Sequence, residues 1–130
     1  YVDRKGKEPL CIWAKGKKDA KAKVEEVLKE VPQEKSIGIL TCDGDSAWDV
    51  RRMFGNTIKE ERPIQYILAP DKTMEEKIIA MPIMLAKGLE FDVVIVWDDR
   101  SENYWEENKN LRYLMATRAL HELYFVSFEK

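Results

Sequence analysis

The sequence predicts an α/β domain built around a largely parallel β-sheet. Apolar, strand-like runs alternate with helical patterns along the chain, which is typical of βα units. One of these runs, "VVIVWD" at Val93–Asp98, has an unbroken apolar stretch, as expected for a strand that is covered on both faces. The chain has 130 residues, of which 45% are hydrophobic, enough to build one core. We therefore expect residues 1–130 to form a single domain.

The elements are predicted from periodicity and from turn residues. Ala20, Val24, Val27 and Leu28 form a helical stripe, with Asp19 as the expected N-cap. A second helix is expected after Ser46 and Asp49, which have capping-box spacing. Pro82 indicates an edge or an irregularity near the end of its strand. The predicted strands cover residues 9–14, 36–40, 64–68, 78–84, 93–98 and 122–129; the predicted helices cover 19–31, 46–54 and 111–120, and a polar connection covers 98–110.

The composition excludes some functions and leaves others open. Lys and Arg number 22 and Asp and Glu number 24, so the net charge of −2 gives no general basic field for nucleic acid, although a local phosphate site remains compatible. Cys11 and Cys42 lie in apolar runs, which favours buried free thiols; a disulfide is the alternative. The chain has no run near the ~18 apolar residues of a membrane span and no signal peptide, so we expect a cytoplasmic protein with no membrane partner. It begins with Tyr1, and we expect it to be a piece of a longer protein.

An arginine interrupts the apolar stripe of the last predicted helix. Leu111, Leu114 and Met115 stand at i, i+3 and i+4, and the next position of the stripe, i+7, is Arg118. An inward guanidinium is costly unless an anion pairs with it. An internal salt bridge, or a long side chain that reaches water at the helix end, explains the pattern. The alternative is an arginine aimed at the phosphate of a ligand.

A polar loop, "LAKGLEFD", separates two apolar runs. Ligands of open α/β sheets bind at loops after strands, and this loop follows the strand predicted at 78–84. Gly88 permits positive φ and exposed amide groups for an anion, Lys87 adds a positive charge, and Glu90 can accept hydrogen bonds from a hydroxyl group such as that of a ribose. The sequence thus suggests a nucleotide-binding loop.

The same loop also fits a purely structural role. It would then be a short helical turn in which Lys87 and Glu90 are solvated, while Leu89 and Phe91 fill the core. A single glycine does not decide between these interpretations.

Several common kinds of site find no support in the sequence. It contains no G-x-x-x-x-G-K-[ST] phosphate loop and no Cys/His cluster with zinc spacing. The single histidine, His121, falls at a predicted helix-to-strand turn rather than in a catalytic triad. Asp98 and Asp99 end a strand, where paired carboxylates can bind Mg²⁺, but solvated strand-end acids are common. We therefore predict no metal site in this chain.

Two segments resemble conserved motifs of a known family. "LAKGLEFDVVIVWD" resembles motif V of the UvrD/Rep-like superfamily-one helicases, and "LRYLMATRALHELYF" resembles their motif VI. The order of the two segments is that of the family, and the preceding strand and capped helix are similar to the carboxyl-terminal half of these enzymes. Among the branches of this helicase family, the HelD-like branch is the most similar to this sequence.

The resemblance implies the second, C-terminal RecA-like motor domain, a three-layer α/β domain that lacks its own phosphate loop. The N-terminal RecA-like domain would carry that loop and the Mg²⁺ ligands, with ATP between the two domains. By position, Arg118 would contact the γ-phosphate during hydrolysis, Glu90 the ribose region and Gly88 the phosphates, with Lys87 in a supporting role. Thr41 stands where motif IV often carries an arginine near the nucleotide. The whole enzyme would be an ATP-dependent DNA helicase or translocase, and this chain alone would be inactive.

Two departures leave alternatives open. The family usually has Thr-x-His at the start of motif V, and these positions hold Pro82 and Met84, so no nucleic-acid-binding residue is predicted. DNA, single-stranded or duplex, would be bound by the full-length protein. The parent protein is alternatively an ATP-driven, HelD-like factor that remodels RNA polymerase, or a degenerate interaction domain.

Overall fold

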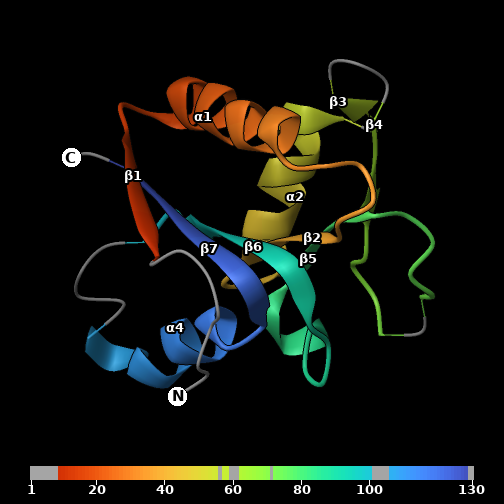
Figure 1. The fold of residues 1–130 in the computed structure, drawn as a ribbon. Helices are drawn as coiled ribbons and strands as arrows, with labels where there is room; N and C mark the ends of the chain where they lie inside the picture. Colours follow the sequence, from red (N-terminus) through yellow and green to blue (C-terminus); the bar gives the residue numbers. More distant parts are fainter. Residues whose placement is uncertain (1–8, 56, 59–61, 71, 101–105, 129–130) are drawn as a thin grey trace.

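A computed structural model describes residues 9–55, 57–58, 62–70, 72–100 and 106–128 (Figure 1). The predicted polar connection at 98–110 is described only outside residues 101–105. The strands are β1 Leu10–Ala14, β2 Ile37–Thr41, β3 Thr57–Ile58, β4 Arg62–Tyr66, β5 Ile78–Pro82, β6 Phe91–Asp98 and β7 Ala119–Phe128; the helices are α1 Lys17–Glu30, α2 Gly44–Phe54, the 3₁₀ helix η1 Ile83–Leu85, and α4 Lys109–Ala116.

The strands form one sheet in the order β1-β7-β6-β2-β5-β4-β3. All neighbouring strands from β1 to β4 run parallel, and only the short β3 is antiparallel to β4. The central strand β2 lies between β5 and β6, and its five residues are all buried. The predicted α/β class with a mostly parallel sheet is confirmed.

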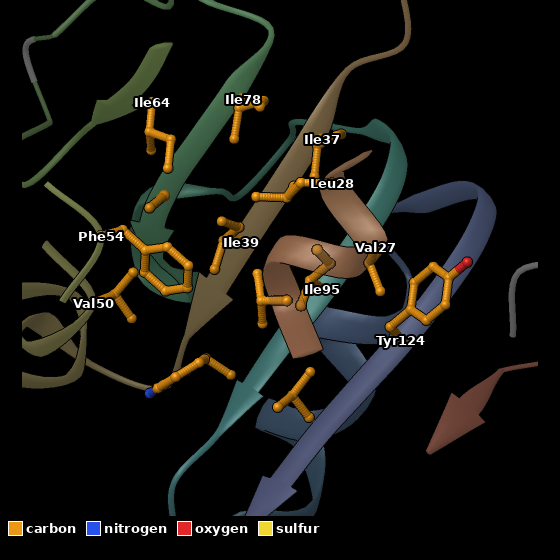
Figure 2. Close-up of a cluster of buried hydrophobic side chains, with 14 of the residues drawn as sticks. Val27, Leu28, Ile37, Ile39, Val50, Phe54, Ile64, Ile78, Ile95 and Tyr124 are labelled. Atoms are coloured by element: carbon orange, nitrogen blue, oxygen red, sulfur yellow. The ribbon is translucent and has the colours of Figure 1, made fainter. Parts of the chain in front are cut away.

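Two layers of helix cover the two faces of the sheet, which gives the predicted three-layer architecture. Helices α1 and α2 pack on one face, where Figure 2 shows the cluster around Leu28, Ile39 and Ile95. The segment η1 and helix α4 lie on the opposite face, over a second cluster that includes Phe91 and Met115. The second face carries both motif-like segments, so the fold brings them together.

Several helix boundaries differ from the predictions, because local hydrogen bonds decide them. Asp43, not Ser46, caps α2: its carboxylate accepts from the Ser46 N–H at 2.9 Å. Helix α1 begins after Gly16, and the carboxylate of Asp19 lies inside the first turn, where it accepts from the Lys15 N–H at 2.9 Å. The prediction of caps at Ser46 and Asp19 was wrong by one turn in each case.

The edge prediction for Pro82 was also wrong. Strand β5 lies inside the sheet, between β2 and β4, and Pro82 is its last residue, paired with Thr41. The chain turns directly into η1, so proline ends the strand without interrupting the ladder. The predicted strand extended to Met84, and the structure ends it at Pro82.

The two cysteines differ in exposure. Cys42 is buried, whereas Cys11, on the edge strand β1, is exposed, and both are free thiols. The prediction of buried thiols therefore holds for Cys42 alone. None of the helices in the described ranges is long and apolar enough to cross a membrane.

Candidate nucleotide site at the motif V and VI segments

The loop between β5 and β6 crosses the α4 face of the sheet. The 3₁₀ turn is closed by the bond from the Ala86 N–H to the Ile83 carbonyl, and the Leu89 N–H donates to the Ala86 carbonyl, both at 2.9 Å. Gly88 has φ of +83°, a conformation that favours glycine, and a Cβ there would meet only open space. The loop leaves the carboxyl end of β5, as predicted, but it returns to the amino end of β6.

Apolar side chains fix this loop to the sheet. Phe91 is 1% exposed and its ring lies where a Cβ on Gly38 would approach it to 2.5 Å. Leu89 is partly buried against the same cluster. Lys87, Gly88 and Glu90 stay exposed. The loop therefore has both predicted properties, since it is anchored in the core and presents polar groups to the outside.

Arg118 lies beside this loop. Its Nη1 donates to the Leu89 carbonyl at 3.4 Å and its Nη2 to the Thr117 hydroxyl at 3.2 Å. The backbone joins them as well, since the Phe91 N–H donates to the Arg118 carbonyl at 2.8 Å. Within the described part of the chain, no carboxylate forms an ion pair with Arg118. The internal salt bridge that would explain this arginine is therefore absent among those residues.

The helical stripe was predicted correctly only in part. Helix α4 ends at Ala116, because the Thr117 hydroxyl donates to the Leu114 carbonyl at 2.8 Å and the chain enters β7 at Ala119. Arg118 thus lies after the helix rather than at its i+7 position. Met115 is fully buried, but Leu114 is 46% exposed.

A cavity of about 390 Å³ opens between the two motif segments. Two cationic side chains, Lys87 and Arg118, line it together with apolar residues, and no carboxylate of the described residues does. The apolar lining comes from Ile83, Met84, Leu111 and Leu114. Two positive charges in a cavity that the described residues line without a carboxylate suit a polyanion such as a triphosphate.

Gly88 and Glu90 flank Leu89, the residue whose carbonyl accepts the hydrogen bond from Arg118. Of the five predicted residues, Arg118 and Lys87 therefore line one cavity, and Gly88 and Glu90 lie on the loop beside it.

Thr41 lies elsewhere. It ends β2, pairing with Trp97 near the carboxyl end of β6, whereas Arg118 lies at the amino ends of β6 and β7. Its side chain is fully buried, and its hydroxyl donates to the Asp43 carbonyl at 2.8 Å. The structure does not bring Thr41 to the other four residues, and its nucleotide role stays a prediction.

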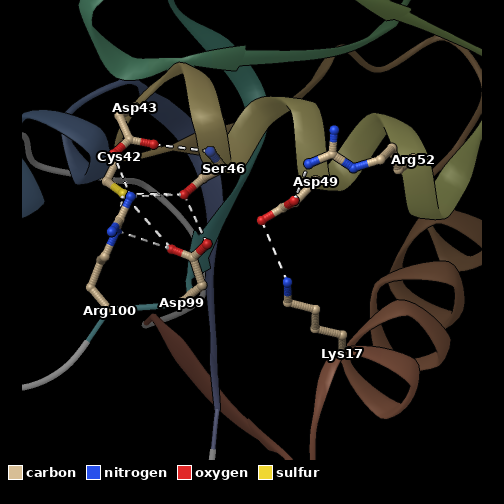
Figure 3. Close-up of polar contacts among 8 residues, drawn as sticks. All are labelled: Lys17, Cys42, Asp43, Ser46, Asp49, Arg52, Asp99 and Arg100. Carbon is tan, nitrogen blue, oxygen red and sulfur yellow. Dashed lines mark hydrogen bonds and ion pairs between the residues drawn. The ribbon is translucent and has the colours of Figure 1, made fainter.

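A second polar cluster, which the sequence analysis missed, joins the carboxyl ends of β2 and β6 (Figure 3). Arg100 donates to Cys42 Sγ at 2.9 Å, to Ser46 Oγ at 3.3 Å and to the Asp43 carboxylate, and it lies 3.6 Å from Asp99 Oδ1. Ser46 also donates to Asp99 at 2.8 Å. The residues come from segments 53 to 58 positions apart, so only the adjacency of β2 and β6 reveals the cluster.

This second cluster is internally satisfied. Burial raises the pKa of the Cys42 thiol, so Cys42 has little thiolate character. The paired acids are engaged separately, since Asp98 accepts from Ser127 Oγ at 2.9 Å and Asp99 from Ser46. Among the described residues, no group of three or more His, Cys, Asp or Glu residues is placed to hold a metal ion.

His121 lies on β7, not in the predicted turn. It is exposed, and its Nε2 lies 3.6 Å from Asp92 Oδ1. Among the described residues, no nucleophilic side chain is hydrogen-bonded to His121, so this part of the chain offers no catalytic triad.

The chain is similar to known helicase C-terminal domains in sequence and in structure. Residues 77–126 match the profile of the UvrD-like helicase C-terminal domain family. The chain is similar to the solved C-terminal domain of a possible DNA helicase from Lactobacillus plantarum WCFS1, with 26% sequence identity and a TM-score of 0.77 over 95% of this chain and 75% of that one. The search of curated proteins gave no significant match.

The fold is a RecA-like α/β domain that matches the C-terminal domain of a possible DNA helicase. The segment matched by the family profile contains both predicted motifs, so the predicted resemblance to the UvrD-like helicases is confirmed over residues 77–126. The HelD-like branch stays a prediction.

Proposed function

We propose that this chain is the second motor domain of an ATP-dependent DNA helicase or translocase and that it completes the ATP site of the whole protein. The observation that carries the proposal is the position of Arg118, beside the Leu89 carbonyl in a cavity shared with Lys87 and without a carboxylate partner among the described residues. A guanidinium in this state is available to an anion that comes from outside the chain.

The residues fit a bound triphosphate. Arg118 and Lys87 supply positive charge, and the open space next to Gly88 lets a phosphate approach the backbone closely. ATP supplies the phosphoryl group, and its Mg²⁺ ligands are expected in the N-terminal motor domain. The part of Arg118 is to stabilise the negative charge that develops during hydrolysis, which is worth several kcal/mol in order of magnitude.

Movement would follow from closure of the two motor domains around ATP. The apolar side chains at the rim of the cavity, with Met84 73% and Leu114 46% exposed, provide surface that a neighbouring domain would cover. Closure brings Arg118 to the nucleotide and hydrolysis releases it, so that the domains step along nucleic acid. This chain alone would not hydrolyse ATP, because it carries only half of the site.

One observation favours the alternative of a HelD-like, RNA polymerase-remodelling factor. At the start of motif V, Pro82 is buried in β5 and Met84 is exposed, so neither offers a polar group to nucleic acid. A protein that uses ATP as a conformational signal needs no such contact from this loop. Measuring whether ATP turnover of the whole protein rises with single-stranded DNA or with RNA polymerase separates the two candidates.

ATP turnover of the whole protein tests the proposed role of Arg118. Arg118→Ala is expected to reduce ATP turnover by about 100-fold or more, with partial recovery in Arg118→Lys. Arg52→Ala is the matched control, because Arg52 is an exposed arginine of α2 paired with Asp49 at the surface. Near-normal turnover in Arg118→Ala would contradict the proposal.

A further inference from the structure

The ladder between β6 and β7 is irregular near the start of β7. Phe91 pairs with Ala119, but the following pair joins Val93 to Glu122. Two steps along β6 therefore face three steps along β7, so β7 contains a bulge close to Arg118, the residue that precedes this strand. Bulges redirect the adjoining backbone and are over-represented next to active sites. This bulge therefore lies where it can set the direction of Arg118.

His121 lies in this bulge, opposite Asp92 of β6. Its Nε2 atom is 3.6 Å from Oδ1 of Asp92, and the two side chains are 50% and 25% exposed. The distance is too long for a hydrogen bond, but it allows an ion pair when the imidazole is protonated. Attraction between His121 and Asp92 across the bulge therefore requires a proton on the histidine.

Hydrogen bonds from the chain before β2 hold Asp92 in place. Its Oδ2 accepts from the Ser36 N–H at 2.9 Å and from the Ser36 hydroxyl at 3.2 Å, and its own N–H donates to Ser36 Oγ at 2.9 Å. The neighbouring Val93 N–H donates to the Ser36 carbonyl at 3.0 Å. The side-chain bonds use Oδ2, whereas Oδ1 is the oxygen that a protonated His121 would contact. Asp92 is thus a fixed anchor for the bulge.

Charged side chains from three segments lie near His121. A cavity of about 210 Å³ lies beside it, and the other charged groups that line it among the described residues are Lys35, Asp92 and Glu122. Lys35 lies just before β2, Asp92 lies on β6, and Glu122 follows His121 on β7. An imidazolium here would therefore have two carboxylates and one ammonium group around it, with the Asp92 carboxylate at ion-pair distance. Opposite charges at this distance attract, although solvent weakens the attraction.

The bulge and Arg118 are connected through the backbone. The Phe91 N–H donates to the Arg118 carbonyl at 2.8 Å, and the Arg118 guanidinium donates to the Leu89 carbonyl at 3.4 Å. Asp92 is the residue after Phe91, and His121 comes three residues after Arg118. The ion pair therefore closes the ladder one step beyond the bond that fixes the Arg118 backbone. A rearranged bulge would move the guanidinium relative to the motif V loop, and small displacements of a catalytic group lower the rate.

We infer that His121 is a positioning residue for Arg118: its imidazolium, paired with Asp92, fixes the bulge of β7 and so holds the guanidinium where the γ-phosphate arrives. This inference rests on the proposed function, because it concerns the same arginine. It predicts that ATP hydrolysis by the whole protein responds to the charge at position 121. Histidine changes charge between about pH 5 and 8, so the contribution is present at the acid end of this range and lost at the alkaline end.

Substitutions at His121 separate the effect of charge from the effect of shape. His121→Gln removes the ionisable group and keeps a polar side chain, whereas His121→Lys carries a positive charge over the whole pH range of the assay. ATP turnover of the whole protein is measured at about pH 6 and about pH 8, where histidine differs in charge. Each variant is compared with wild type at the same pH, which removes other effects of pH on the reaction.

We expect the kcat of His121→Gln to be about three- to five-fold below wild type at the lower pH and equal to it at the higher pH, which is the size expected for an exposed ion pair. The KM for ATP should not change, because Arg118 acts in the transition state. His121→Lys should equal wild type at the lower pH and exceed it at the higher pH. In an Asp92→Asn background, the loss caused by His121→Gln should disappear.

Lys18→Gln is the matched control, because it removes a positive charge from an exposed position of α1 outside this cavity. Its kcat relative to wild type should be the same at both pH values. A ratio of His121→Gln to wild type that does not change with pH, or a loss that persists with Asp92→Asn, would overturn the inference. Arg118→Ala is measured alongside. Normal turnover in that variant would remove the proposed function itself, whereas a strong loss there without an effect at His121 would remove only this inference.

Discussion

Arg100 and Arg118 lie at opposite ends of the same pair of strands and differ in how their charge is satisfied. Arg100 follows β6 and bonds to Cys42, Asp43 and Ser46, next to Asp99. Arg118 precedes β7 and donates to a carbonyl and a hydroxyl group, with no carboxylate partner in the described part of the chain. An arginine saturated by its own chain stabilises the fold, whereas one that contacts only neutral acceptors can bind an external anion.

We expect the largest effect on stability at Gly38, which packs in the core against Phe91 at the end of the motif V loop. A Cβ on Gly38 would lie 2.5 Å from the ring of Phe91, which ends the motif V loop and is 1% exposed, so neither group can move easily. Gly38→Ala should lower the free energy of unfolding by about 1–3 kcal/mol, measured by urea denaturation. A penalty that is unchanged in a Phe91→Leu background would show that the contact is not the cause.

The next effect distinguishes the clustered Arg100 from an exposed arginine, Arg52. Arg100→Ala should cost about 1–2 kcal/mol of unfolding free energy, because Ser46 and Asp99 lose a partner in a partly buried cluster. Arg52→Ala removes an exposed arginine and should cost no more than about 0.5 kcal/mol. If both substitutions cost the same, the cluster at the ends of β2 and β6 contributes nothing beyond a surface ion pair.

A smaller effect on stability is expected at Gly88 in the loop between β5 and β6. Gly88→Ala should cost about 1 kcal/mol, because φ of +83° is unfavourable for alanine even though its Cβ meets open space. Gly44→Ala is the matched control, since its Cβ also meets nothing but its φ lies outside the positive range. Equal stability of the two variants would show that the loop readily adopts another conformation.

The smallest effect depends on pH. Asp92 accepts from the Ser36 N–H at 2.9 Å and from its hydroxyl at 3.2 Å, which lowers the pKa of the carboxyl below its ordinary value of 3.8. The folded state therefore releases this proton more readily than the unfolded state, and the resulting stability is present above pH 3.8 and lost as the pH falls through the lowered pKa. Relative to wild type, Asp92→Asn should be less stable by about 1 kcal/mol or less at neutral pH.

That difference should shrink as the pH falls below 3.8. Urea midpoints of both proteins across this range measure it. A difference that stays constant with pH would mean that the hydrogen bonds to Ser36 do not depend on the charge of Asp92.

Sequence patterns predicted those features that depend on local periodicity or on motif similarity. The buried stripe of α1, including Val24 and Leu28, follows from spacing alone. Lys87, Gly88, Glu90 and Arg118 were predicted from the motifs, and the fold places Arg118 beside the loop that carries the other three.

Features that depend on contacts between distant segments were not predictable. The Arg100 cluster requires β2 and β6 to be neighbours, although their residues lie 53 to 58 positions apart. The end of α4 is set by the Thr117 hydroxyl, which competes with the helical pattern that extended the prediction to residue 120.

One measurement tests the difference between the two arginines most directly: ATP turnover and thermal unfolding of the whole protein are recorded for Arg118→Ala and Arg100→Ala. We expect opposite outcomes. Arg118→Ala should lose about 100-fold or more in turnover with an unchanged unfolding midpoint, while Arg100→Ala should lower the midpoint and keep its turnover at temperatures where it is folded. An Arg118→Ala variant that turns over ATP normally, or that loses activity only because it unfolds, would contradict the account.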